Sequence, residues 1–410
     1  MDRRSYDAII VGGGLSGGLC ALALAHHQLS VAVIDAADPQ RMRGLRFDGR
    51  TTALAYASAR VFRRLGLWDA LAHEAEPIRD ILVTDGRARG PSGAASRHHL
   101  HFDSRRLNGE TALGYIVENR LLRNAIFDAI ERTDRIDLLA PAEARGVDIR
   151  SGGATAELAG GRKLSAPLIV GADGKESPLR RRAAIKTSHW SYPQTGIVAT
   201  VSHERPHNGV AHEYFLPSGP FAILPMTQNR SSLVWTERAA AAPAFLALDD
   251  TGGGRAIADR FGEFLGETRL AGPRWSYPLS FHFAQRFVAP RLALIGDAAR
   301  AIHPIAGQGF NLGVKDIAAL AEVLRESASL GVDLGGMAAL KDYERWRRFD
   351  SAALAFGTDA LNRLFSNDFA PLRLLRDIGM GAVNAVDPLR TFFMRHAGGD
   401  VGSLPPLMRE

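Results

Sequence analysis

The feature that most constrains the fold is a glycine-rich turn near the start of the chain. A short apolar run at residues 8–11 stops at Gly12-Gly13-Gly14-Leu15-Ser16-Gly17, and small and apolar residues follow as far as residue 25. A second apolar run at residues 31–34 ends on Asp35. Strand, glycine turn, helix and strand in this order predict a βαβ unit that opens a parallel sheet.

This turn predicts a dinucleotide-binding site. Gly12 permits the tight turn, Gly14 lets the backbone approach a pyrophosphate, and Gly17 allows the helix to pack closely on the strand. The N–H groups at the helix start, around Leu15 and Ser16, favour phosphate. Asp35 can accept hydrogen bonds from ribose hydroxyls. The pattern leaves open whether the dinucleotide is FAD or NAD.

Two further motifs follow apolar runs. Residues 168–170 lead into Gly171-Ala172-Asp173-Gly174, and residues 292–295 lead into Gly296-Asp297. Ligands of open parallel sheets bind beyond the carboxyl ends of the strands, so both aspartates are candidates for one site. The motif at residues 171–174 is also typical of a strand-ending turn with a helix cap. After the second motif come Pro304 and residues 307–311, whose glycines let backbone approach a flat ligand at a helix start.

Composition excludes several classes. The chain of 410 residues is 46% apolar and 23% charged, which is typical of a globular protein, and no apolar run is long enough to span a membrane. One cysteine, Cys20, allows no internal disulfide and fits a reducing compartment, so we expect a cytoplasmic protein. The net charge is +6, but no basic stripe interleaved with aromatic residues indicates nucleic acid. No metal site is expected.

The rest of the chain predicts a mixed architecture. Short strands around residues 144–166 predict a β-meander, and residues 190–285 predict mostly antiparallel strands. Residues 239–254 have the composition of loop and linker. Beyond residue 310 we expect helices, broken near residues 331–336, Pro371 and Pro388. The fold class is therefore α/β (α+β overall), with a Rossmann-like domain, a meander insertion, an antiparallel sheet domain and C-terminal helices.

The ordered motif set resembles the single-component aromatic flavoprotein monooxygenases, the enzymes similar to p-hydroxybenzoate hydroxylase. The resemblance covers nearly the whole chain. Finer features are similar to one branch of that family, the ubiquinone-biosynthesis hydroxylases. These features lie at residues 48–54, 65–68, 77–81, 114–120, 303–309 and 362–366.

The resemblance implies FAD as the cofactor. It places the glycine turn and Asp35 at the ADP half, Asp173 near the pyrophosphate and Asp297 at a ribityl hydroxyl. It places Arg50, Asn119 and Arg120 along the phosphates and ribityl chain, and His303, Pro304 and residues 307–311 at the wall beside the flavin ring. The implied cofactor-binding residues are Gly12, Gly14, Leu15, Ser16, Gly17, Asp35, Arg50, Asn119, Arg120, Asp173, Asp297, Gly307, Gln308, Gly309, Phe310 and Asn311. One departure is Arg300, where the family often has histidine.

The resemblance also implies an activity. NAD(P)H would reduce FAD, and the reduced flavin would form a C4a-hydroperoxide with dioxygen. Its distal oxygen would attack the ring of a polyprenylated phenol in ubiquinone biosynthesis. The alternative is an FAD-dependent reductase or epoxidase acting on another apolar substrate. Tyr192, His212, Tyr214 and His303 are candidates for proton transfer by region only, and the sequence does not choose among them.

The expected division is non-contiguous. Residues 1–75, 100–185 and 285–335 are assigned to the FAD-binding domain, residues 76–99 and 186–284 to the substrate domain, and residues 336–410 to a C-terminal helical region. Within 361–396, aromatic and aliphatic residues alternate with arginines. This pattern is typical of a helical layer on the core with arginines in water, or of a surface that lies on the inner face of a membrane or on other ubiquinone-biosynthesis proteins.

Overall fold

The parallel sheet is the part of the fold that the glycine turn predicted. The computed structural model describes residues 5–43, 47–86, 99–107, 109–262, 264–366 and 370–410. Its six-stranded sheet has the order β19-β20-β12-β1-β2-β8, in which all neighbours pair in parallel except β19 and β20. The strands are β1 (Ala8–Val11), β2 (Val31–Ile34), β8 (Ile136–Leu139), β12 (Leu168–Gly171), β19 (Val288–Ala289) and β20 (Leu292–Leu294). The Rossmann-like prediction is confirmed.

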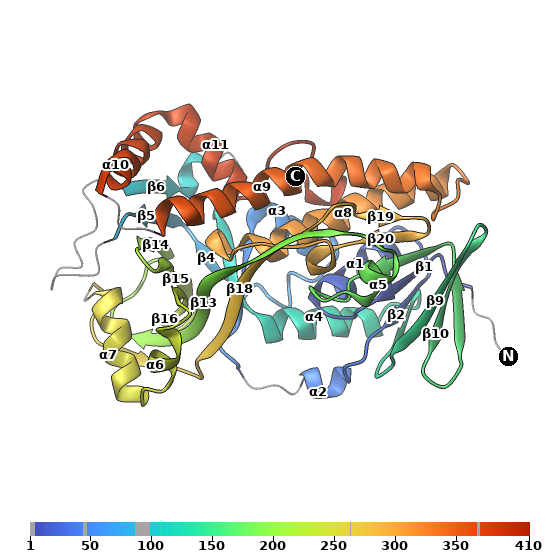
Figure 1. The fold of residues 1–410 in the computed structure, drawn as a ribbon, viewed down its shortest axis with the longest axis horizontal. Helices are drawn as coiled ribbons and strands as arrows, with labels where there is room; N and C mark the ends of the chain where they lie inside the picture. Colours follow the sequence, from blue (N-terminus) through green and yellow to red (C-terminus); the bar gives the residue numbers. More distant parts are fainter. Residues whose placement is uncertain (1–4, 44–46, 87–98, 108, 263, 367–369) are drawn as a thin grey trace.

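Helices cover this sheet through close backbone contacts. The turn at Gly12 leads into α1 (Leu15–His26), which packs between α4 (Asn119–Glu131) and α8 (Gln308–Ser329). A Cβ atom at Gly18 would lie 2.5 Å from Ile126 of α4, so glycine lets the two helices approach. The shorter helices are α2 (Pro39–Arg43), α3 (Tyr56–Arg64) and α5 (Pro178–Arg182). Figure 1 shows α1, α4 and α8 gathered around β1 and β2.

A second, larger sheet stands beside the first (Figure 1). Its order is β21-β18-β13-β16-β15-β14-β5-β6, and β17 pairs with β13. Most neighbours are antiparallel, as expected, although β14 and β5 are parallel. The strands are β5 (Asp80–Thr84), β6 (His99–Asp103), β13 (Thr187–His203), β14 (Val210–Leu216), β15 (Gly219–Met226), β16 (Arg230–Arg238), β17 (Thr268–Leu270), β18 (Trp275–Ala284) and β21 (Arg300–Ala301).

Two small sheets complete the strands. The predicted meander consists of β9 (Ala144–Arg150), β10 (Gly153–Leu158) and β11 (Lys163–Ala166). The other consists of β3 (Thr51–Ala55), β7 (Gly114–Glu118) and β4 (Glu76–Ile78). It contacts β15 of the large sheet and α8 beside the parallel sheet. It therefore bridges the two halves of the fold.

The expectation of loop and linker at residues 239–254 is wrong. The segment forms α6 (Ala242–Leu246) and the start of α7 (Asp250–Phe261). Asp249 caps α7 by accepting a hydrogen bond from the N–H of Gly252 at 2.7 Å, and Ile257 is completely buried. Each glycine in a helix interior costs about 1 kcal/mol relative to alanine. The cap and the buried contact outweigh the three consecutive glycines.

The C-terminal region is helical, as predicted. It consists of α9 (Met337–Phe365), α10 (Ala370–Ala385) and α11 (Asp387–Ala397). The expected break near Pro371 is confirmed: α9 ends at Phe365 and α10 begins at Ala370, so this proline is the second residue of α10, where proline is tolerated. Among the described residues, none of the helices combines the length and apolar character needed to cross a membrane.

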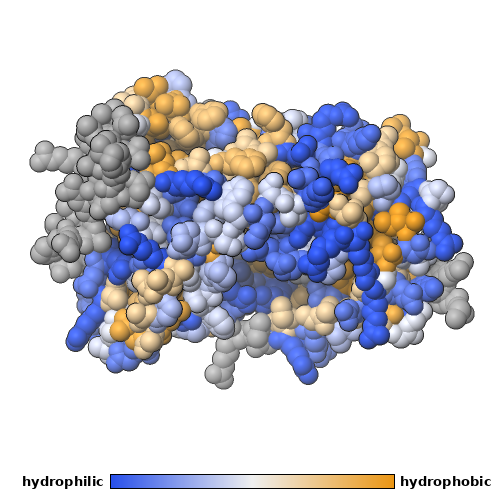
Figure 2. All heavy atoms as spheres, in the orientation of Figure 1, coloured by the Kyte–Doolittle hydropathy of each residue, from blue (hydrophilic) through white to orange (hydrophobic). Residues whose placement is uncertain are grey.

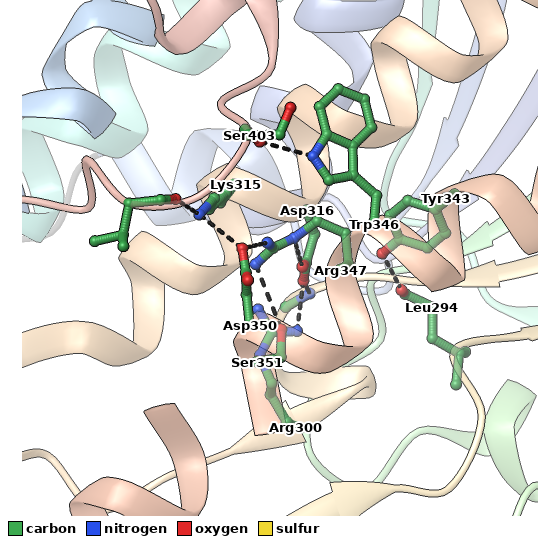
Figure 3. A network of polar contacts seen from close by, with 12 residues as sticks. Leu294, Arg300, Lys315, Asp316, Tyr343, Trp346, Arg347, Asp350, Ser351 and Ser403 are labelled. Atoms are coloured by element: carbon green, nitrogen blue, oxygen red, sulfur yellow. Dashed lines mark hydrogen bonds and ion pairs between the residues drawn. The ribbon is translucent and has the colours of Figure 1, made fainter. Parts of the chain in front are cut away.

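A buried ion network ties the end of β20 to α8 and α9 (Figure 3). The Asp316 carboxylate accepts hydrogen bonds from Arg300 at 2.6 Å and from Arg347 at 3.0 Å. It also accepts the N–H of Gly296 at 3.1 Å. All three charged side chains are buried. Arg300, which stands where the resemblance expects histidine, is therefore an ion-pair partner inside the protein.

We expect Asp316→Asn to lower the free energy of unfolding. Removing one member of a buried ion pair typically costs about 3–5 kcal/mol, because an uncompensated charge stays buried. Here Arg300 would lose its anion, and Arg347 would keep only its longer contact with Asp350 at 3.4 Å. The measurement is urea denaturation. Asp148→Asn, which breaks an exposed pair with Arg150, is the control and should leave the midpoint unchanged; an equally stable Asp316 variant would contradict this role.

Candidate cofactor and substrate site

The three glycines of the first motif differ in what surrounds them. Gly12 has φ of +99°, and a Cβ there would lie 2.3 Å from the carbonyl oxygen of Ala172. A Cβ at Gly17 would lie 1.7 Å from the carbonyl oxygen of Gly12. A Cβ at Gly14 would meet no protein atom within 4 Å. The chain itself requires the first and third glycines, whereas the second leaves open surface at the start of α1.

Asp35 lies beside this turn, at the end of β2. Its carboxylate accepts a hydrogen bond from the N–H of Gly13 and another, at 2.7 Å, from the N–H of Ala37. Each oxygen keeps a free lone pair, because a carboxylate can accept about four hydrogen bonds. The side chain is half-buried at the edge of the sheet. It can therefore still accept ribose hydroxyls.

The other two motifs meet the first at the same edge. Asp173 accepts the N–H of Leu179 at 3.1 Å through Oδ2, whereas its buried Oδ1 has no hydrogen-bond partner among the described residues. Buried oxygens without a partner are rare, so Oδ1 fits a polar ligand. A Cβ at Gly296 would lie 2.9 Å from the hydroxyl oxygen of Ser16, which joins the third motif to α1.

Asp297 belongs to the third motif, which follows β20 of the parallel sheet. Its side chain is accessible to water, yet desolvation by the surrounding protein raises its pKa. Arg180 donates to the carbonyl oxygens of Ala298 and Lys175 at 2.8 and 2.7 Å. It stabilises the turn after Asp297.

A cavity of about 710 Å³ lies between the small sheet, the large sheet and α9–α11. The predicted residues that line it are Arg50, Asn119, Pro304, Gly307, Gln308 and Asn311. Asn311 accepts the N–H of Ala55 at 2.9 Å and donates to the carbonyl oxygen of Ala53 at 2.8 Å, which fastens the start of α8 to β3. Gly307 has φ of +62°, and a Cβ there would lie 2.9 Å from the Cβ of Ala53. Residues 304–311 and β3 thus form one wall of the cavity.

Other predicted residues lie away from this cavity. Gly12, Gly14, Leu15, Ser16, Gly17, Asp35, Asp173 and Asp297 belong to the sheet edge and do not line it. Arg120 pairs with Glu118 at 2.6 Å and does not line it either. Gly309 leaves open space on its Cβ side, while Phe310 packs near Phe62, with ring centres 6.5 Å apart.

His303 is buried behind the wall. Its ring lies edge-on to Tyr192 at 5.3 Å, and burial lowers its pKa to about 4, so it is neutral at pH 7. Neither ring nitrogen has a hydrogen-bond partner among the described residues. The Tyr192 hydroxyl donates to Asp359 at 2.6 Å. Of the four side chains considered for proton transfer, His212 alone lines the cavity.

The sequence did not identify the far half of the cavity. It is lined there by Glu213, Leu361, Leu364, Phe365, Met380 and Phe393. One signal in the sequence could have identified Glu213. Ala211, Glu213 and Phe215 occupy alternate positions of β14, so a carboxyl group lies between two apolar side chains on the same face of the strand. Arg376 is one of the arginines within residues 361–396, which the sequence placed either in water or on a membrane or protein surface. It is instead buried and pairs with Asp85 at 3.3 Å.

These features define a class: a protein with a Rossmann-like dinucleotide site at the carboxyl ends of its parallel strands and a large apolar cavity. The comparisons agree. A family model described as an FAD binding domain matches residues 5–348. Ubiquinone hydroxylase UbiL of Rhodospirillum rubrum is 48% identical over 98% of this chain and 92% of its own length. The 3-demethoxyubiquinol 3-hydroxylase of Escherichia coli is 34% identical over 97% of this chain and 100% of its own length.

The chain belongs to the FAD-dependent aromatic hydroxylases, and within them to the ubiquinone-hydroxylase family. It is an FAD-dependent monooxygenase. Among solved structures, p-nitrophenol 4-monooxygenase PnpA from Pseudomonas putida DLL-E4 has a TM-score of 0.79 at 18% identity, covering 98% of this chain and 100% of that one. At that identity the likeness shows a shared fold. The Diels-Alderase PyrE3, with a TM-score of 0.74, shows that the fold alone does not fix the reaction.

Gly14→Val separates cofactor binding from folding. Because a Cβ there meets no protein atom within 4 Å, we expect a folded protein whose FAD content after purification falls to a small fraction, since the valine would project toward the pyrophosphate. The measurement is the ratio of flavin to protein absorbance, with circular dichroism for the fold. Gly152→Val, at another glycine with open space, is the control and should retain flavin. Full flavin content in Gly14→Val would refute the assignment.

Proposed function

We propose that the protein hydroxylates the aromatic ring of a polyprenylated phenol in ubiquinone biosynthesis, with NAD(P)H as electron donor. The observation that carries the proposal is the cavity, which begins at residues 304–311 and continues into an apolar end formed by α9–α11. Its volume lies within the range of about 300–1,000 Å³ found for small-molecule sites. The names of the relatives support the same chemistry. We find no feature that favours a reductase or an epoxidase.

We assign the cofactor to the sheet edge and the adjoining wall. Gly12–Gly17 and Asp35 would bind the ADP half, Asp173 the pyrophosphate region and Asp297 the ribityl chain. Arg50, Asn119 and Arg120 would lie along the phosphates and the ribityl chain, toward the cavity. Pro304 and residues 307–311 would carry the ring, in front of the neutral His303. Bound FAD supplies the activation of dioxygen that no side chain provides.

The protein's own contribution is to orient the substrate and to exclude water. Polar groups gather at one end of the cavity, around Arg50, Thr51 and Asn119. Leu361, Phe365 and Met380 supply apolar surface at the other end, where Glu213 and Arg376 also line the cavity. A phenol with a long apolar tail fits with its ring at the wall and its tail along these apolar side chains. Apolar walls would also keep water away from the oxygen that bound FAD activates.

We further propose that α11 meets a membrane surface, from which the substrate enters. Val386, Leu389, Phe392 and Phe393 of this region are 38–52% exposed, and Phe393 also lines the cavity. Figure 2 shows hydrophobic residues gathered at the top of the view, over α10 and α11. Arg395, which is 56% exposed, lies in the last turn of α11 and pairs with Asp400 at 3.7 Å. Such a surface suits the anionic interior face of a membrane.

We retain the non-contiguous division of the chain as a proposal. Residues 1–75, 100–185 and 285–335 contain the parallel sheet, and residues 76–99 and 186–284 contain most of the large sheet. β6 pairs with β5 across the boundary at residue 99, so that boundary lies inside the large sheet. Residues 336–410 contain α9–α11.

The test of the reaction is isotopic. Purified protein, NAD(P)H and a short-chain prenylphenol under ¹⁸O₂ should give a product heavier by one labelled oxygen atom. Dioxygen uptake should rise when the phenol is added. Consumption of NAD(P)H with reduction of the substrate and no labelled oxygen would overturn the proposal in favour of a reductase.

The membrane surface is tested by sedimentation with vesicles of phosphatidylglycerol and phosphatidylethanolamine. We expect Phe392→Glu to reduce binding about tenfold, because it replaces buried apolar area with charge on an anionic surface. Ile149→Glu, on the exposed face of β9 in the distant meander, is the control. Equal binding by wild type and Phe392→Glu would contradict the proposed surface.

A further inference from the structure

One carboxyl group faces the apolar cavity. Glu213 lies on β14, where Ala211, Glu213 and Phe215 point to the cavity side of the large sheet and are all buried. Its neighbours across the sheet are Val83 on β5 and Ala222 on β15. Among the described residues that line the cavity, Glu213 is the one carboxylic acid.

Glu213 has no evident structural role. No hydrogen bond or ion pair joins its carboxyl group to any other described residue, although it is only 9% exposed. Burying a carboxyl group without a partner destabilises a protein. Other buried acids in this chain are paired; Glu237, for example, is bound by Arg260 and by the N–H of Arg238. An unpaired acid in an apolar row therefore points to a ligand.

We propose that Glu213 is the general base that takes the hydroxyl proton of the phenolic substrate in this cavity. The inference rests on the proposed function, because it requires a phenol as the occupant. It adds to that function the proton-transfer group for which no side chain had been identified.

The register of the sheet places Glu213 within reach of a bound ring. Thr51 of β3 donates to Ser232 of β16 at 2.8 Å, and Ser232 pairs with Leu224 of β15. Leu224 therefore lies on the part of the large sheet that contacts the small sheet, and it packs in the same apolar cluster as Ala53 of the cavity wall. Ala222, which pairs with Glu213, is two residues away on the same face, a distance of about 7 Å along the strand. One six-membered ring with its hydroxyl spans a similar distance.

The environment suits a base for a phenol. Burial raises the pKa of Glu213 to about 8. Transfer of a proton from a phenol of pKa about 10 to such a group is about 10²-fold uphill, against about 10⁶-fold for an ordinary glutamate of pKa about 4.3. General bases work best when their pKa lies near the working pH.

The proton balance closes over one turnover. The phenol O–H bond breaks and a carboxyl O–H bond forms on Glu213, which gives a phenolate with an electron-rich ring. Bound FAD would supply the oxygen atom from dioxygen; once the ring carbon has gained it, that carbon carries both hydrogen and hydroxyl, and the former phenolate oxygen is a carbonyl. Glu213 returns its proton to that oxygen as the ring carbon releases its own to water. The ring is aromatic again and Glu213 is again a carboxylate.

Three of the other ionisable groups along the cavity are poorly suited to this role. The remaining ionisable side chains along the cavity are Arg50, His212, Tyr277, Arg376 and His396. Arg50 is paired with Asp48 and Arg376 with Asp85. Burial lowers the pKa of His212 to about 4, which makes it a weaker base than Glu213.

The test is Glu213→Gln, which keeps the shape and a hydrogen-bond donor but cannot accept the proton. We expect unchanged FAD content and a 10²–10⁴-fold loss of hydroxylation with a prenylphenol, the usual contribution of a general base. The rise of wild-type kcat with pH toward about 8 should disappear in the variant. Glu237→Gln replaces a buried glutamate that does not line the cavity and should leave the rate and its pH profile unchanged.

A second substrate distinguishes proton transfer from positioning. On a prenylphenol with ring fluorines that ionises near neutral pH, the gap between wild type and Glu213→Gln should shrink at least tenfold, because no base is needed. An equal gap on both phenols, or no gap on either, would overturn the proposal. If the wild type hydroxylates neither phenol, the proposed function itself fails.

Stability provides a readout that does not depend on activity. Between pH about 4.5 and 8 the folded protein keeps a proton on Glu213 that the unfolded chain has lost, so wild-type stability falls across this window relative to the glutamine variant. The melting temperature of Glu213→Gln, measured relative to that of the wild type, should therefore rise from pH 5 to pH 8. A constant difference would mean that Glu213 is not held in an apolar environment, and the proposal would fall.

Discussion

The structure depends on the contact between the turn at Gly12 and the start of α1. Gly17 lies so close to the carbonyl oxygen of Gly12 that no side chain fits between them, and Gly12 itself lies against Ala172. This contact brings β1, α1 and β12 together and sets the open N-terminus of α1 at the sheet edge. Asp35 and Asp173 then follow from parallel pairing, because the carboxyl ends of β2 and β12 lie on either side of β1.

The second half of the site is positioned by charge. Asp316 holds the backbone at Gly296 and pairs with Arg300 and Arg347, which fixes the turn at Asp297 against α8. The same helix begins at Gln308, where Asn311 fastens it to β3. A rigid α8 therefore connects the sheet edge with the cavity wall, so the two ends of one long cofactor can be held by a single element.

Local patterns predicted the parts of the fold that local chemistry determines. The strands at Ala8–Val11 and Val31–Ile34 are buried on both faces, which makes a continuous apolar run. The sequence could not show that Arg300 pairs with Asp316, or that Glu213 faces a cavity, because these depend on packing between distant segments. It was wrong at residues 251–254, where a cap at Asp249 and the buried Ile257 outweigh glycine composition.

The central claim is that one cavity receives the flavin ring at residues 304–311 and a phenol between that ring and Glu213. The most direct measurement is a crystal structure of the protein with FAD and a prenylphenol bound. We predict the phenol hydroxyl within hydrogen-bond distance of the Glu213 carboxyl and the prenyl tail along Phe365 and Met380. A flavin ring away from residues 304–311, or a phenol bound outside this cavity, would contradict the account.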